Sequence, residues 1–257
     1  MRLATWNVNS IRARIERVEA LLVRHDIDVL ALQETKAKPD QIPTIGLEGL
    51  GYEIAATGYD QWNGVAIISR VGLDDVQVGF ENMPTFKDKV EARALGATCG
   101  GVRVWSLYIP NGRTTEDPHY AYKLEWLKQL RDDAAKWTAD DVALVGDWNI
   151  APTDDDVYDI KAFERETHVT PPERAAFQAF LDAGYADLAG PYTPGPGVYT
   201  YWDYFQDRFP RNHGLRIDFQ LGSPSLAERV TGAFIDVPER RGEGASDHAP
   251  VVVDLED

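Results

Sequence analysis

Cysteine and long apolar runs are scarce or absent in this chain. Its 257 residues include one cysteine, Cys99, so an intramolecular disulfide is excluded and a reducing compartment is favoured. No apolar run approaches the roughly 20 residues that a membrane-spanning helix needs. The first residues, 2–6, enter a strand-like pattern with no charged-then-apolar leader before them. We therefore expect a soluble cytoplasmic protein without a membrane partner.

Positive charge is also in short supply. The chain has 26 Lys and Arg against 42 Asp and Glu, a formal net charge of −16. Nucleic-acid partners usually require a basic surface, so this balance taken alone argues against DNA. Basic residues nevertheless cluster at 12–17, 36–38 and 208–216. Each cluster alone is equally typical of a solvated face, but net charge does not say where the charges lie, and a metal ion can neutralise several acids.

The remaining composition predicts one α/β domain (α+β by some schemes) covering residues 1–257. Hydrophobic residues make up 44% of the chain and charged residues 26%, as in ordinary globular proteins, and we find no repeat or linker. Three helix starts are signalled by cap residues: Asn9 or Ser10, Asp117 followed by proline, and Thr170 with a capping box to Glu173. The expected strands are 3–8, 28–34, 65–69, 102–109 and 142–145.

Polar residues recur where these apolar runs begin or end. Gly146 ends the strand at 142–145, so Asp147 and Asn149 are expected on the loop beyond it, and Asp247 and His248 directly precede a valine run. The full set is Asn7, Glu34, Tyr108, Asp147, Asn149, Asp218, Asp247 and His248. Such oxygen donors suit Mg²⁺ or Mn²⁺. Zinc is not favoured, because the five histidines and single cysteine lack a zinc-site spacing.

Six of these residues also have a structural interpretation, which for Asn149 is a loop cap. Glu34 alone fits a solvated carboxylate at a strand end, and Asp147 after glycine fits an Asx turn. Asn7 fits a turn, Tyr108 an amphipathic core position, and a single His248 a hydrogen-bonded structural histidine. A purely structural explanation requires all of these separate interpretations to be correct at once. We therefore favour a metal site that cleaves phosphate esters.

Six sequence blocks carry a resemblance to a known family. They lie at 5–9 (TWNVN), 32–36 (LQETK), 108–111 (YIPN), 146–149 (GDWN), 214–218 (GLRID) and 246–250 (SDHAP). In this order they resemble the exonuclease III family of abasic-site endonucleases. GDxN and SDH alone indicate only the wider endonuclease/exonuclease/phosphatase superfamily, whereas LQETK and GLRID narrow it to the DNA-repair branch. The resemblance implies a four-layer sandwich of two mixed β-sheets flanked by helices, with the active site at one edge.

The resemblance also implies roles for single residues. Asp147 would take the proton from the attacking water, and Asn149 would orient that water and contact the phosphoryl oxygens. His248, held by Asp218, would donate to a non-bridging oxygen, and Tyr108 would contact the phosphate or the leaving oxygen. Glu34 would be the principal metal ligand. The full set of metal-site residues that the resemblance implies is Asn7, Glu34, Asp147, Asn149 and Asp247.

Substrate choice is expected in the aromatic loop around Tyr201. By resemblance, Tyr201, Leu215 and Ile217 would form a pocket for an extruded sugar that has lost its base. The alternative is that the aromatic run is a core strand, which we prefer for Trp202 and Phe205. Candidates for contacts with backbone phosphates are Arg12, Lys36, Asn111, Arg113 and Arg211.

The chain departs from the family pattern at a few positions. Asn9 stands where some members carry Asp, and Leu215 where some carry Trp, which together indicate the bacterial exonuclease III-like branch. We expect a monomeric DNA repair nuclease dependent on Mg²⁺, with Mn²⁺ as a substitute. Its substrate would be double-stranded DNA with abasic sites or blocked 3′ ends, cut 5′ to the abasic site or trimmed at the 3′ end.

Two other functions remain open at this point. One is a superfamily phosphatase acting on a small-molecule or lipid phosphate, and the other is a non-enzymatic interaction protein.

Overall fold

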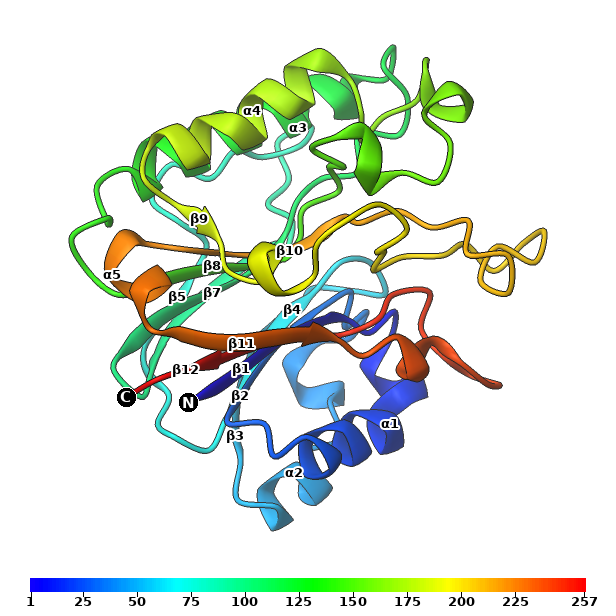
Figure 1. Cartoon of the computed structure of the whole chain (residues 1–257). Coiled ribbons are helices and arrows are strands. Elements are labelled where there is room, and N and C mark those ends of the chain that lie inside the picture. The colour runs from blue at the N-terminus through cyan, green and yellow to red at the C-terminus, as the bar shows by residue number, and fades with distance from the viewer.

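Two six-stranded mixed sheets form the centre of the protein, whose computed structural model describes residues 1–257 (Figure 1). In the first sheet, ordered β11-β12-β1-β2-β4-β3, only β1 and β2 are parallel neighbours. Its strands are β1 (Arg2–Asn7), β2 (Val29–Gln33), β3 (Glu53–Thr57), β4 (Val65–Ser69), β11 (Val230–Ile235) and β12 (Val251–Leu255).

The second sheet has the order β5-β6-β7-β8-β10-β9, and only β7 and β8 are parallel neighbours. Its strands are β5 (Asp74–Val78), β6 (Ala94–Cys99), β7 (Val102–Tyr108), β8 (Val142–Asp147), β9 (Ala186–Asp187) and β10 (Asp218–Gly222). The single cysteine, Cys99, is buried at the end of β6.

Helices cover the outer face of each sheet, so the expected four-layer sandwich is confirmed. Figure 1 shows α1 and α2 beside the first sheet and α3 and α4 over the second. The helices are α1 (Ile11–Arg24), α2 (Ile45–Gly49), α3 (Pro118–Ala134), α4 (Pro171–Asp182) and α5 (Pro224–Glu228). Short 3₁₀ turns are η1 (Pro39–Gln41), η2 (Asp154–Asp156), η3 (Ile160–Phe163), η4 (Gly190–Tyr192) and η5 (Val237–Arg240). None of the helices has the length and apolar character needed to cross a membrane.

Apolar side chains fill the three spaces between these layers. Val29 and Val145 belong to the cluster between the two sheets, and Leu21 of α1 to the cluster under the first sheet. Trp126 and Phe180 anchor the cluster between the second sheet and helices α3 and α4. Since β2 and β8 are buried along their whole length, they read as continuous apolar runs in the sequence.

The three predicted helix starts are confirmed. The Ser10 hydroxyl accepts a hydrogen bond from the Ala13 N–H, and the Asp117 carboxylate accepts one from the His119 N–H. Thr170 forms the predicted capping box at the start of α4. These starts were recognisable because a cap satisfies N–H groups that the first helical turn leaves without partners.

The strand directions bring the predicted polar residues to one edge. Parallel β7 and β8 end side by side, with Tyr108 opposite Asp147, and antiparallel β10 begins there, with Asp218 also opposite Asp147. In the first sheet Asn7 closes β1 and Glu34 follows β2. The expectation that Asp147 lies on a loop is wrong: it is the last residue of β8, where strand pairing fixes its backbone.

Candidate active site

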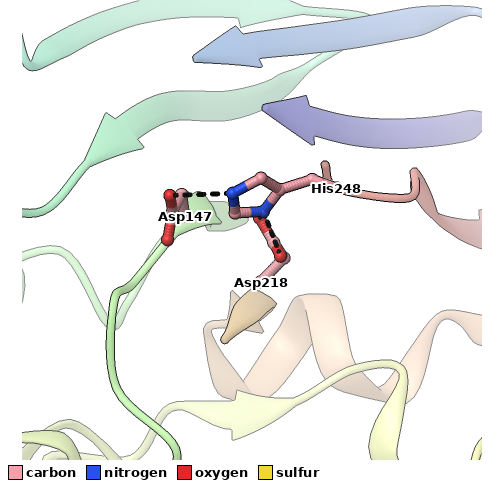
Figure 2. A group of neighbouring side chains, drawn as sticks. All are labelled: Asp147, Asp218 and His248. Atoms are coloured by element: carbon pink, nitrogen blue, oxygen red, sulfur yellow. Dashed lines mark hydrogen bonds and ion pairs between the residues drawn. The ribbon is translucent and has the colours of Figure 1, made fainter. Parts of the chain in front are cut away.

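His248 lies between two carboxylates at this edge, as Figure 2 shows. Its Nδ1 is 2.8 Å from Oδ2 of Asp218, and its Nε2 is 3.7 Å from Oδ2 of Asp147. All three side chains are buried. Strand pairing of β8 with β10 sets the separation of the two carboxylates, and the loop before β12 delivers the ring between them.

The shared burial changes the proton affinity of both partners. Burial alone would lower the pKa of His248, but the carboxylates of Asp218 and Asp147 raise it to about 10. Burial raises the pKa of Asp147 to about 7, although the neighbouring imidazolium opposes the shift. His248 is therefore a cation at neutral pH, and Asp147 is poised to exchange a proton.

Asn7 joins the two halves of the site. Its Nδ2 donates to Oε1 of Glu34 at 2.9 Å and to Oδ2 of Asp147 at 3.0 Å. The other oxygen of Glu34 is 3.2 Å from the ammonium of Lys36. Burial would raise the pKa of Glu34, but the Asn7 hydrogen bond and the Lys36 charge outweigh it, so this pKa lies below its usual range.

Several residues in and around the site adopt left-handed backbone conformations, among them Glu34 and Asn149. Glu34 has φ 49° and Asn149 has φ 50°, which cost free energy for residues other than glycine. Asn149 is held there by its N–H, which donates to Asp147 Oδ1 at 3.0 Å, and by its Nδ2, which donates to the carbonyl oxygen of Ile109 at 2.9 Å. The Asx turn considered for Asp147 is therefore real and coexists with its place in the site.

Tyr108 also belongs to the site and lies beside Glu34. Burial and the charge of Glu34 raise the pKa of its phenol well above the ordinary value, so the hydroxyl keeps its proton. The guanidinium of Arg93 lies 4.8 Å from the ring centroid. Tyr108, Asn111 and Arg113 also line a cavity of about 910 Å³ beside the site.

Asp247 lies at the rim and is linked to the rest through Asn9. Asn9 Nδ2 is 3.3 Å from Asp247 Oδ1, and the Lys36 ammonium donates to Asn9 Oδ1 at 2.6 Å. Ser246 donates to the carbonyl oxygen of Asn7 at 2.7 Å, which fixes the loop that carries Asp247.

The donor set of this edge fits a hard divalent cation. Ligand atoms of Asp147, Asp218 and His248 lie within 4.8 Å of one another, a spacing that a shared metal ion would require. A protonated His248 cannot act as a ligand, however, and Asp218 is committed to it. The carboxylate of Glu34 is 21% exposed and reachable, which makes it the better first ligand.

The structure brings the three residues of the predicted sugar pocket together. Tyr201 pairs with Leu215 through the backbone, and its ring centroid is 4.9 Å from that of His248. Leu215 and Ile217 are buried in one small cluster against which Tyr201 packs. Trp202 is buried as expected, but Phe205 is 74% exposed, so its assignment to the core is wrong.

The residues predicted to contact backbone phosphates differ in how they are connected to the rest of the site. Arg12 donates to the carbonyl oxygen of Lys36 at 3.2 Å and is exposed near the site. Asn111 Nδ2 is 3.4 Å from Asn149 Oδ1. Arg211 is exposed, and no side-chain contact joins it to the other site residues.

Sequence reasoning missed a buried ion pair behind Asn149. Lys123 and Glu173 have fully buried side chains, and the Lys123 ammonium donates to the carbonyl oxygen of Asn149 at 2.6 Å. The available signal was a lysine within the apolar stripe of α3, next to Tyr122 and Trp126.

Comparison with known proteins agrees with this geometry. The family model described as the Endonuclease/Exonuclease/phosphatase family matches residues 4–248. The chain belongs to this family. It is 29% identical to exodeoxyribonuclease III of Haemophilus influenzae over 98% of both chains.

Two solved structures superpose over the full length of both chains. One is the 3′ phosphatase NExo from Neisseria bound to a product DNA hairpin, with a TM-score of 0.93 and 36% identity. The other is an AP endonuclease from Archaeoglobus fulgidus, with a TM-score of 0.94 and 32% identity. The predicted resemblance is confirmed, and within the family the chain is a phosphodiesterase of the exonuclease III type.

Proposed function

We propose that the protein is a Mg²⁺-dependent DNA repair nuclease. It removes nucleotides or blocking groups from DNA 3′ ends and hydrolyses the phosphodiester 5′ to abasic sites. The observation that carries the proposal is the meeting of Glu34, Asp147, Asn149 and the His248–Asp218 pair at one edge. The names of its relatives, an exodeoxyribonuclease III, a 3′ phosphatase and an AP endonuclease, support both activities.

Asp147 is assigned as the general base. A pKa of about 7 lets its carboxylate accept a proton from the attacking water at neutral pH. Asn149, held next to it by the N–H bond to Asp147 Oδ1, orients that water and contacts the phosphoryl oxygens. Their shared hydrogen bonds keep both groups in place before the substrate arrives, which lowers the cost of reaching the transition state.

The cation of His248 stabilises negative charge on the phosphate. Asp218 holds the ring through Nδ1, which leaves Nε2 to donate to a non-bridging oxygen. The protonated phenol of Tyr108 is the candidate donor toward the leaving oxygen. This division assigns one group to the nucleophile, one to the equatorial oxygens and one to the leaving group.

A divalent cation would be held chiefly by Glu34. Asn7 and Asp247 would complete the ligand set, with the oxygens of Asp147 and Asn149 adjacent. When bound, the metal supplies polarisation of the phosphoryl oxygen and neutralises its charge. The all-oxygen donor set favours Mg²⁺, with Mn²⁺ as a substitute.

Tyr201, Leu215 and Ile217 are assigned to the sugar at the cleavage site. Extrusion from the duplex is least costly where the base is already missing, so a small apolar pocket favours abasic sites. The proposed partner is double-stranded DNA bound by a monomer in the bacterial cytoplasm. Backbone phosphates would be contacted by Arg12, Lys36, Asn111, Arg113 and Arg211.

The test compares three substrates with and without Mg²⁺: a duplex with one abasic site, a duplex with a 3′-phosphate, and a small phosphomonoester. Wild type is expected to cleave both duplexes only with the metal. Asp147→Asn and Glu34→Ala should each lose about 100-fold or more in kcat, the contribution typical of a general base or a metal. Asp140→Asn, an exposed carboxylate at the other end of β8, is the matched control and should remain active.

Two results would contradict the proposal. Undiminished cleavage by Asp147→Asn would remove its role as the base. Activity on the small phosphomonoester alone would favour the superfamily phosphatase instead.

A further inference from the structure

Lys123 and Glu173 form an ion pair without access to water. Their side chains are 0% exposed, and the Lys123 ammonium is 2.5 Å from Oε1 of Glu173. Lysine and glutamate are almost never fully buried unless paired, because removing each charge from water is costly. An apolar pair of similar size would often be at least as stable, so the pair calls for an explanation beyond packing.

The remaining donors of Lys123 point at the backbone of the active site. A lysine ammonium has three N–H groups. One donates to Glu173, one to the carbonyl oxygen of Asn149 at 2.6 Å, and one to the carbonyl oxygen of Asn111 at 3.2 Å. Asn149 follows β8 and Asn111 follows β7. A single ammonium thus ties together the two loops that carry amide side chains into the site.

Glu173 fixes the ammonium from the opposite side. Its Oε1 also accepts from the His168 N–H at 3.0 Å, and its Oε2 accepts from the Thr170 N–H at 3.1 Å and the Thr170 hydroxyl at 2.7 Å. The same carboxylate therefore caps α4 and neutralises Lys123. His168 in turn has its Nδ1 2.6 Å from the Asn149 carbonyl oxygen, the atom that Lys123 also contacts.

The contacted residue is one whose backbone needs support. Asn149 has φ 50°, a conformation that costs free energy for a residue with a side chain. Its carbonyl oxygen accepts from Lys123 while its own N–H donates to Asp147. Loss of the ammonium would release the loop toward ordinary backbone conformations and move the Asn149 amide away from the base.

We propose that Lys123 is a positioning residue that holds Asn149 in its reactive placement, with Glu173 as its anchor. The consequence for turnover rests on the function proposed above for Asn149. Neither side chain reaches substrate, since both are fully buried. Because Asn149 orients the attacking water, the loss should fall on kcat and not on substrate binding.

The test uses the double variant Lys123→Met/Glu173→Gln. Methionine keeps the unbranched stem of the lysine, and glutamine can still form the capping box at α4, so no unpaired charge is buried. The single variant Lys123→Met leaves Glu173 uncompensated and should unfold more readily than the double variant. The matched control is Arg229→Met/Asp141→Asn. This ion pair lies at the start of β8, whereas Asp147 is the last residue of that strand.

Two measurements on the purified full-length protein decide the matter. On a 3′-phosphate duplex with Mg²⁺, the double variant should lose about tenfold or more in kcat with KM within threefold of wild type. Independently of any substrate, hydrogen exchange of the backbone N–H of Asn149 should become at least roughly tenfold faster. The control should change neither quantity.

Failure of this inference can be told apart from failure of the proposed function. An unchanged exchange rate at Asn149, or a kcat within threefold of wild type, overturns the positioning role. A kcat loss matched by the control pair also overturns it, because the effect would then be general. Faster exchange in a protein whose wild type cleaves no DNA refutes the proposed function alone.

Discussion

Asp147 is kept in the folded protein at a position that disfavours its charged form. Burial raises its pKa to about 7, whereas an unfolded aspartate titrates near 3.9. Folding therefore binds a proton between these values, and the folded state loses stability as pH rises through 7. The carboxylate that is proposed to act as base is thus a cost to stability, as is common at active sites.

The variant Asp147→Asn should consequently be more stable than wild type at pH 8. We expect a gain of up to about 4 kcal/mol, since the pKa rises by roughly three units at about 1.4 kcal/mol each and already includes the attraction of His248. The gain should shrink at pH 5, where wild type is already protonated, and disappear below pH 4. Thermal unfolding in a metal chelator at the three pH values measures this, with Asp140→Asn as control. A lower Tm for Asp147→Asn at pH 8 would contradict the assigned pKa.

At the scale of elements, the aromatic loop separates two residues that look alike in sequence. Trp202 is 1% exposed and donates from Nε1 to Asn212 Oδ1 at 3.0 Å, whereas Phe205 is 74% exposed. Tyr204, which lies between them, contacts Asn9 and so places the loop beside the site. The loop therefore has a buried aromatic residue at its start and an exposed one at its tip, and the exposed ring is the candidate for stacking on the DNA of the proposed function.

Alanine substitutions at these two positions should therefore change different quantities, the stability in one case and the DNA affinity in the other. Trp202→Ala should cost about 3–5 kcal/mol of stability, the range for buried tryptophan. Phe205→Ala should leave Tm unchanged and weaken duplex binding several-fold, since an exposed ring contributes little to folding. Chemical denaturation and fluorescence anisotropy with an abasic duplex measure the two quantities. A destabilised Phe205→Ala with normal DNA affinity would contradict this division.

The helices, strands and loops also show which features could be predicted from the sequence. The cap signals at Ser10, Asp117 and Thr170 were predictable because each acts within one helical turn. Site residues at strand ends were predictable because apolar runs mark where buried strands stop. Phe205 and Lys123 were not, since exposure of a loop tip and the partner of a buried ammonium are set by segments distant in sequence.

For the whole molecule, the net charge of −16 constrains how DNA can be bound. Many cations are already paired within the protein, including Arg24 with Asp236 and Arg216 with Asp187. Such pairs reduce the positive charge that is open to phosphates. Binding should then depend on a few cations near the site and on the substrate's shape, with weak affinity for undamaged duplex.

This dependence can be measured as the slope of log affinity against log salt. Each phosphate neutralised contributes about −0.9, so the four candidate cations predict a slope no steeper than roughly −4. Arg113→Gln should make the slope shallower by about one, because Arg113 is exposed and lines the cavity beside Tyr108. Arg131→Gln, on the outer helix α3 and paired with Asp132, should leave it unchanged. A slope near −10 for wild type, as for a highly basic DNA binder, would mean that DNA contacts extend far beyond this edge and that the acidic surface is not excluded from the complex.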